Sequence, residues 1–195
     1  MARPRQFDEA DVLHAARTQF QRTGYAGTSM NDLQEATGLH NGSLYAAFGS
    51  KHDLLVHCLE DYCQDLAATA RDHLAGSDQT PVRRLQAFVR EAARTAAAEN
   101  YLGCLAGRAA SELAGTDDQV GTRIQSSFTE LRALLLSCLQ AGQRSGKLSA
   151  AADPEQLASM LLAVLRGIDA MAVAGCPASF LLEAADAACA ALPLA

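Results

Sequence analysis

Apolar residues recur three and four positions apart along almost the whole chain, which is the spacing of α-helices with one buried face. The breaks between these stretches fall at glycine, proline and short polar segments, and no stretch alternates in the way that predicts a strand. The pattern therefore predicts an all-α protein of nine helices, three of them compact at the front of the chain. The expected helices cover about residues 8–23, 29–36, 41–47, 50–73, 82–96, 104–114, 120–142, 154–172 and 178–192.

Helix starts are marked by side chains that accept hydrogen bonds from free backbone N–H groups, and in one case by a proline at the first helical position. These signals stand at Asp8, Ser29-x-x-Asp32, Ser50-x-x-Asp53 and Asp153-Pro154. Glycine punctuates the front of the chain at Gly24, Gly38 and Gly49. The front segment is therefore predicted to be a helix followed by two short helices that a glycine-containing turn joins.

Such an arrangement is a helix-turn-helix, in which the second short helix enters the major groove of DNA. Leu33, Leu39 and Leu44 are apolar where the two short helices must meet, which leaves small and polar residues on the outer side of the second one. Thr28 and Ser29 stand where a helix start binds phosphate. The residues that we expect to contact DNA are Arg3, Arg5, Thr28, Ser29, His40, Asn41, Ser43, Tyr45 and Lys51, to which the resemblance described below adds Gly42.

Three of these assignments have plainer alternatives. Arg3 and Arg5 form either a basic arm that reaches the minor groove or an ordinary basic terminus. His40 either contacts a base or faces solvent. The whole front segment could also be a packing module in which Lys51 is a solvated charge.

The front of the chain resembles the TetR family of bacterial transcriptional repressors from Phe7 to about Leu59. The pieces that carry the resemblance are G-Y-A-G-T-S, the A-T-G-L turn and S-L-Y-A-A-F-G-S-K-x-D-L-L, at their mutual spacing. The resemblance implies a homodimer that binds a near-palindromic operator with its front domains. It also implies that a small molecule bound in the variable rear domain releases the DNA.

At matching positions, the resemblance implies phosphate or groove contacts for Thr28, Ser29, Tyr45 and Lys51, and base reading at 41–43. This sequence departs from the family in two places. His40 stands where a capping Ser or Thr is frequent, so we expect capping to shift to Asn41. Ala46 and Ala47 replace larger polar residues, which predicts fewer direct base contacts and more reliance on DNA shape.

Charge is unevenly distributed along the 195 residues, whose net charge is −6. Residues 1–52 hold five Lys and Arg against five carboxylates, whereas residues 53–195 hold eleven against seventeen. A uniformly basic nucleic-acid coat is therefore excluded, but a local DNA-binding surface is not. With 49% hydrophobic and 5% aromatic residues and no Trp, the composition favours closely packed helices. We expect two domains, a DNA-binding domain at 1–52 and a helical domain for effector binding and dimerisation at 53–195.

The rear part offers candidates for two further functions. Broad apolar faces on the last two helices predict a dimer interface, although helices buried within one monomer look similar. The expected interface residues are Leu157, Leu161, Leu165, Ile168, Ala172, Phe180, Leu181, Ala184 and Ala188. The expected effector pocket, among the fourth to eighth helices, is lined by Tyr62, Leu66, Phe88, Tyr101, Cys104, Arg108, Phe128, Leu131 and Arg166, each of which could equally be plain core.

Cys104 carries a further hypothesis. It follows Gly103 at a helix start, where the helix dipole favours a thiolate, and Arg108 adds positive charge one turn later. The segment G-C-L-A-G-R-A-A-S-E-L-A is similar to one in a TetR subgroup with members that sense electrophiles or oxidants through cysteine. The alternative is a small buried filler. His57, Cys58, Cys63 and His73 do not converge as zinc ligands, so no metal or other cofactor is expected.

Other classes of function find little support. The sequence has no glycine-rich phosphate loop, nucleophile elbow or paired catalytic carboxylates, so an enzyme is not expected. The longest apolar stretch, 157–165, is shorter than a membrane span and an apolar leader is missing, which predicts a bacterial cytoplasmic protein without a membrane partner. The alternative to a ligand-responsive repressor is a helical small-molecule-binding protein without an operator.

Overall fold

A computed structural model describes residues 7–76 and 79–195, so the basic arm expected at Arg3 and Arg5 lies outside the described residues. Within these ranges the chain forms nine α-helices, as the sequence predicts, and an isolated bridge between Leu148 and Leu194. The helices are α1 (Glu9–Thr23), α2 (Met30–Thr37), α3 (Asn41–Phe48), α4 (Lys51–Leu74), α5 (Pro81–Ala96), α6 (Leu105–Leu113), α7 (Asp118–Arg144), α8 (Pro154–Val173) and α9 (Ala178–Ala190).

The predicted start signals act as caps. Asp8 accepts from the backbone N–H of Ala10, and Asp153 accepts from the first N–H groups of α8. Ser29 and Asp32 form a reciprocal capping box at the start of α2. Before α4, the Asp53 N–H donates to the Ser50 Oγ at 3.0 Å, and the Ser50 hydroxyl donates to Asp53 Oδ2 at 2.7 Å. Local sequence therefore sets these helix starts, as capping requires.

The described chain divides into two compact units. Unit 1 comprises residues up to Gln64 together with Cys104–Ile124, and unit 2 comprises Asp65–Gly103 and Gln125–Ala195. These units do not follow the expected division at residue 52, because α6 packs against α1 and the first half of α4 belongs with the front helices. The predicted division into a DNA-binding domain at 1–52 and an effector-binding domain at 53–195 concerns function rather than compactness, and it stays a prediction.

Unit 1 is built around large apolar side chains from its short helices. Phe20 of α1, Leu33 of α2, Leu44 of α3 and Leu59 of α4 are each 1% exposed or less. The chain turns between α2 and α3 at Gly38, whose φ of 69° lies in the left-handed region that favours glycine. The core and this turn together set the position and orientation of α3 within unit 1.

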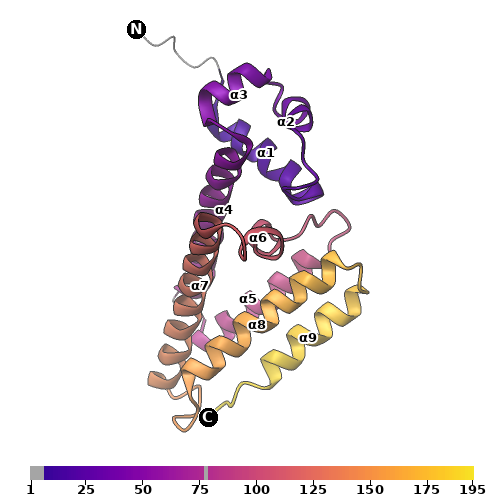
Figure 1. The fold of residues 1–195 in the computed structure, drawn as a ribbon. Coiled ribbons are helices and arrows are strands. Elements are labelled where there is room, and N and C mark those ends of the chain that lie inside the picture. The colour runs from indigo at the N-terminus through magenta and orange to yellow at the C-terminus, as the bar shows by residue number, and fades with distance from the viewer. Residues whose placement is uncertain (1–6, 77–78) are drawn as a thin grey trace. The chain divides into compact units, whose positions relative to one another are not determined.

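Unit 2 centres on three helices that contact one another, α5, α8 and α9 (Figure 1). One continuous core joins them to the second halves of α4 and α7, with Leu85, Leu135 and Leu161 fully buried. Small residues such as Ala158 and Ala185 lie between the helices and let them approach closely. The alanine-rich composition is therefore used for tight helix packing, as expected.

We predict opposite stability changes for two glycines of the helix-turn-helix. A Cβ at either Gly38 or Gly42 meets nothing within 4 Å, so backbone conformation alone decides the effect. Gly38→Ala should lower the free energy of unfolding by about 1 kcal/mol because of its positive φ, whereas Gly42→Ala, inside α3, should raise it by about 0.5 kcal/mol. Urea denaturation measures both changes, and equal signs would contradict this account.

Candidate nucleic-acid interface and rear-domain sites

The outer face of α3 is small, polar and exposed. His40, Gly42, Ser43 and Tyr45 are all exposed, and the Tyr45 side chain is 49% exposed. The opposite face carries Leu44 and Phe48, which are buried in unit 1. The predicted base-reading residues therefore lie together on one side of α3, with Asn41 as the exception.

Asn41 does not cap α3, which corrects the expectation from the sequence. The N-cap residue is His40, and its side chain makes no capping hydrogen bond. Asn41 is the first residue of the helix and is half-buried, and its Nδ2 donates to Asn31 of α2 at 3.5 Å. The Asn41 N–H at the start of α3 donates instead to Oε1 of Gln34 in α2 at 3.2 Å, so that side chain ties the two short helices together at the turn.

The turn between α1 and α2, residues 24–28, differs from the expectation for Thr28. Thr28 is 1% exposed, and its hydroxyl donates to the carbonyl of Gly24 at 2.5 Å. That hydroxyl is therefore committed to the 24–28 turn rather than presented to a phosphate. Ser29, in contrast, is exposed at the start of α2, where its Oγ also accepts from the Asp32 N–H.

Lys51 has an internal role that the sequence did not indicate. Its ammonium donates to the carbonyl oxygens of Tyr25 and Thr28 at 2.9 and 2.8 Å, and it lies 4.2 Å from the centre of the Tyr25 ring. Through these contacts Lys51 anchors the 24–28 turn, and its predicted phosphate contact would have to be made in addition.

The Tyr25 hydroxyl has a raised pKa. Burial is the main cause, and the carboxylates of Asp117 and Asp53 add to this effect.

Two acidic residues missed by the sequence reasoning join the segment from α6 to α7 to the front helices. The Glu112 carboxylate accepts from the N–H groups of Tyr25 and Ala26. Asp117 lies 2.6 Å from Nε2 of His52, and the pKa of its carboxyl is lowered, first by the Val120 N–H and then by His52. The partners in each contact, Glu112 with Tyr25 and Asp117 with His52, are more than 60 residues apart in sequence, so no local sequence pattern predicts them.

The predicted pocket residues divide between the two units. Tyr62, Cys104 and Arg108 belong to unit 1, whereas the other predicted residues belong to unit 2. In unit 2, Phe88 and Leu131 are core residues, and Leu66 is half-buried.

Tyr101, Phe128 and Arg166 make polar or cation–π contacts within unit 2. The Tyr101 hydroxyl donates to Asp169 Oδ1 at 2.6 Å, and the Arg166 guanidinium lies 5.6 Å from the centre of the Phe128 ring. Asp169 is 8% exposed and was not predicted, although the isolated acid in the apolar run of α8 is a visible signal. Buried polar groups against apolar surface are typical of small-molecule sites.

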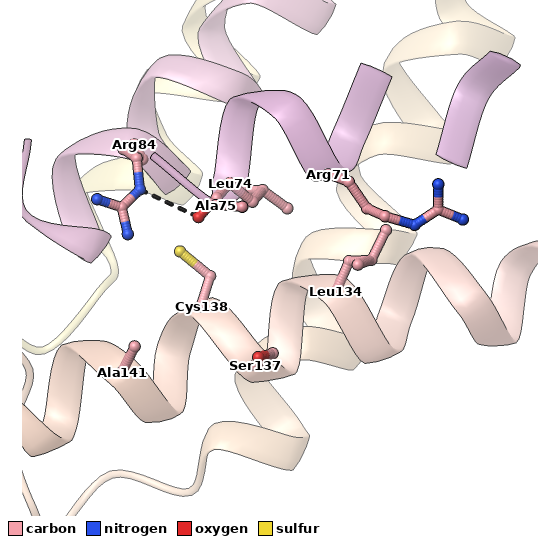
Figure 2. Close-up of a pocket in the computed structure, with 8 residues that line it drawn as sticks. All are labelled: Arg71, Leu74, Ala75, Arg84, Leu134, Ser137, Cys138 and Ala141. Atoms are coloured by element: carbon pink, nitrogen blue, oxygen red, sulfur yellow. Dashed lines mark hydrogen bonds between the residues drawn. The ribbon is translucent and has the colours of Figure 1, made fainter. Parts of the chain in front are cut away.

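A pocket of about 220 Å³ lies elsewhere in unit 2, between the end of α4, the start of α5 and α7 (Figure 2). None of the nine predicted pocket residues lines it. Arg84 closes one side, where its Nε donates to the carbonyl of Leu74, and the Cys138 thiol faces the same space. The lining residues are Arg71, Leu74, Ala75, Arg84, Leu134, Ser137, Cys138 and Ala141.

The predicted dimer residues need a partial correction. Five of them lie in the core of unit 2 and are at most 6% exposed, namely Leu161, Leu165, Ile168, Leu181 and Ala188. Leu157, Ala172 and Ala184 are half-buried, and Phe180 is 55% exposed. The periodic stripe that suggested an interface is thus mainly the face that packs inside the unit.

Apolar surface nevertheless remains uncovered on α8 and α9. Val173 is 49% and Leu182 is 39% exposed, in addition to Phe180. In the described chain, α8 alone is long and apolar enough to cross a membrane, although core helices of soluble proteins often have the same length and composition. Within its most apolar segment, 28% of the helix is buried inside the protein. Apolar residues on both sides of α8 are explained if a second protein surface covers the outer side.

The six cysteines are thiols, five of them buried and Cys176 partly exposed. Burial raises the pKa of Cys58 to about 12, with Asp61 adding to the effect, and both Cys58 and Cys138 are core residues. Cys104 is 4% exposed and is the N-cap of α6, where its Sγ accepts from the Gly107 N–H at 3.4 Å. Among residues 7–76 and 79–195, no group of three or more His, Cys, Asp or Glu side chains is placed to hold a metal.

A helix-turn-helix with an exposed polar second helix, followed by a larger helical unit with uncovered apolar surface, defines a class of helical transcriptional regulators. Comparison with known proteins identifies the family. The family description "Bacterial regulatory proteins, tetR family" matches residues 12–58, and "Tetracyclin repressor-like, C-terminal domain" matches residues 81–181. The chain belongs to the TetR family of bacterial transcriptional regulators.

Relatives cover most of the chain. The transcriptional repressor DhaR of Mycobacterium sp. (strain GP1) is 30% identical over 148 residues, which are 76% of this chain and 73% of DhaR. The repressor ComR of Escherichia coli (strain K12) is 26% identical over 94% of this chain and 88% of its own length. A cysteine mutant of the TetR-family regulator CifR, solved with a 26-base-pair operator DNA, matches with a TM-score of 0.85 and 31% identity, covering 98% of this chain and 100% of that one.

Proposed function

We propose that the protein is a bacterial cytoplasmic repressor that binds a near-palindromic operator as a homodimer and is released by a small molecule bound in unit 2. The observation that carries DNA binding is the exposed face of α3, with His40, Gly42, Ser43 and Tyr45 outward. This proposal is supported by the similarity to CifR, which was solved with operator DNA, and to the transcriptional repressors DhaR and ComR.

The net charge of −6 fits this function when the position of the charge is considered. Acidic residues are in excess behind residue 52, whereas the front segment is neutral. Few cations are available for sequence-independent phosphate contacts, and Lys51 is already engaged within unit 1. Non-specific affinity should therefore be weak, so that stable binding needs both half-sites of a dimer.

Replacement of Tyr45 tests the proposed interface. Because its side chain is about half exposed on α3, Tyr45→Ala should weaken operator binding by about tenfold or more without changing the thermal midpoint. Tyr45→Phe, which removes only the hydroxyl, should give a smaller loss. Gel shifts on a duplex selected from a random library with the wild-type protein measure these affinities, and Tyr45→Ala with unchanged affinity would contradict the assignment.

The dimer is proposed to form through the outer faces of α8 and α9. Phe180, Leu182 and Val173 offer exposed apolar surface there, whereas the inner stripe is buried against α5. Gly167 of α8 borders open space, because a Cβ there meets nothing within 4 Å. The lack of a side chain at this position would let a helix of the partner protomer approach α8 closely.

Phe180→Asp should convert the dimer to monomer, because it places an unpaired charge in an apolar interface. Sedimentation velocity gives the mass of each form. The matched substitution Ala150→Asp, at an exposed position outside α8 and α9, should leave the dimer intact. A Phe180→Asp protein that sediments as a dimer would show that the interface lies elsewhere.

A thiol-triggered release through Cys104 is the mechanistic variant. Its support is the position of the thiol at the start of α6, where it caps the helix and where modification would remove that cap. A bound effector is the other variant, for which Tyr101, Arg166 and Asp169 and the pocket beside Cys138 are the candidate places. A ligand that co-purifies in native mass spectrometry would favour the second variant.

Treatment with N-ethylmaleimide separates the two variants. The Cys104 sulfur adds to the maleimide double bond and its proton ends on the neighbouring carbon, so the cap is replaced by a bulky group. Operator binding by the wild type should be lost, whereas Cys104→Ser, which keeps a capping oxygen, should resist. Cys176→Ser is the control and should behave as the wild type; a Cys104→Ser protein that loses DNA equally would exclude the thiol variant.

A further inference from the structure

The 24–28 turn is held from two sides by opposite charges. On one side, the Lys51 ammonium donates to the carbonyl oxygens of Tyr25 and Thr28. On the other, Glu112 Oε2 accepts from the N–H groups of Tyr25 and Ala26 at 2.9 and 3.2 Å. Each charge thus meets the end of the peptide dipole that it attracts, which fixes the turn in orientation as well as in position.

Glu112 lies in the last turn of α6, where a carboxylate is unfavourable for the helix itself. The C-terminal end of a helix carries partial negative charge, so acidic residues there reduce helix stability. No benefit within α6 therefore explains this side chain. Its contacts with the N–H groups that follow α1 do provide a benefit, since those groups lie beyond the end of the helix and outside its hydrogen-bond ladder.

A second observation shows how close the contact is. Gly24 is the C-cap of α1 with a φ of 75°, and a Cβ built on it would lie 2.0 Å from Glu112 Oε1. The approach of the carboxylate to the turn therefore requires that residue 24 has no side chain. Glycine is needed here for space as well as for backbone conformation.

The 24–28 turn leads directly into the part of the chain that meets DNA in the proposed function. Ser29, the N-cap of α2, follows it immediately, and α2 contacts both α1 and α3. A displacement of the turn would therefore move the start of α2 and the exposed face of α3 together. Operator contacts depend on such placement, because phosphate contacts set the register of the recognition helix on the duplex.

We propose that Glu112 is a positioning residue for operator binding, which acts by holding the N–H groups of Tyr25 and Ala26. This inference rests on the proposed function as an operator-binding regulator. Glu112 itself does not touch DNA; its carboxylate sets the 24–28 turn in the position from which α2 and α3 engage the operator. The residue is exposed, so the contact contributes little to overall stability and its loss should be felt mainly in DNA binding.

Neutralising Glu112 tests the proposal against simple electrostatics. Removal of a negative charge alone should strengthen attraction to DNA, whereas loss of the contact should weaken specific binding. We expect Glu112→Gln and Glu112→Ala to lose at least about fivefold in affinity for the duplex selected on the wild-type protein, the larger loss being that of Glu112→Ala. Glu99→Gln, an exposed carboxylate of unit 2 with the same charge change, should keep or slightly raise the affinity.

Amide hydrogen exchange supplies a readout that a general structural defect would not produce. In full-length Glu112→Ala, exchange at Tyr25 and Ala26 should accelerate while the thermal midpoint stays near that of the wild type. Unchanged exchange at these two amides, or faster exchange with unchanged operator affinity, would overturn the proposal. A loss of affinity that accompanies an equal loss of thermal stability, with exchange raised throughout unit 1, would overturn it as well.

A double-mutant cycle with Gly24 completes the test. Gly24→Ala introduces a collision with Glu112 and also strains the backbone, and only the first effect disappears when residue 112 is alanine. The affinity loss caused by Gly24→Ala should therefore be smaller in the Glu112→Ala background. If the affinity losses of Gly24→Ala and Glu112→Ala were additive, residues 24 and 112 would not be in close contact and the proposal would fail. A wild-type protein that selects no duplex at all would contradict the proposed function instead.

Discussion

The placement of the helix-turn-helix depends on one short turn that is pinned by charge on both sides. The backbone at 24–28 lies between α1 and α2, and two of its N–H groups, those of Gly24 and Thr28, donate to the backbone carbonyls of Phe20 and Tyr25. The Lys51 ammonium satisfies its carbonyl groups, the Glu112 carboxylate satisfies its N–H groups, and the Thr28 hydroxyl closes it from within. Since exposed backbone groups would otherwise bind water and let the turn vary, these contacts convert a loop into a fixed support for α2.

Unit 2 shows how an alanine-rich, aromatic-poor chain obtains a firm core and an outer apolar surface from the same helices. Leucine and small residues on the inner side of α8 and α9 pack against α5, whereas Val173, Phe180 and Leu182 remain outside. One buried polar pair lies within this core, the Asp169 carboxylate and the Tyr101 hydroxyl. A buried carboxylate in such surroundings is costly unless it is hydrogen-bonded, and the Tyr101 hydroxyl offsets part of this cost.

Most of the fold could be predicted from sequence, because its determinants are local. Helix periodicity, the capping residues Ser29 and Asp153 and the turn glycine Gly38 each act within a few residues of themselves. The contacts of Glu112 and Lys51 could not be predicted, since they join segments 23 to 87 residues apart and use residue types common on any surface. For the same reason the stripe through Leu161 and Leu165 could be predicted to be buried, but the helix that buries it could not: periodicity reveals that a face is buried but not which partner buries it.

The close approach of Glu112 to Gly24 constrains how this protein can be recombined with its relatives. A chimera cut at residue 52 would take the 24–28 turn from one parent and α6 from the other, although both belong to one compact unit. If the incoming front segment carried any side chain at position 24, it would collide with this carboxylate. A side chain at residue 24 would push the Glu112 carboxylate away from the turn, so a chimera should keep this contact when α6 is transferred together with the front helices.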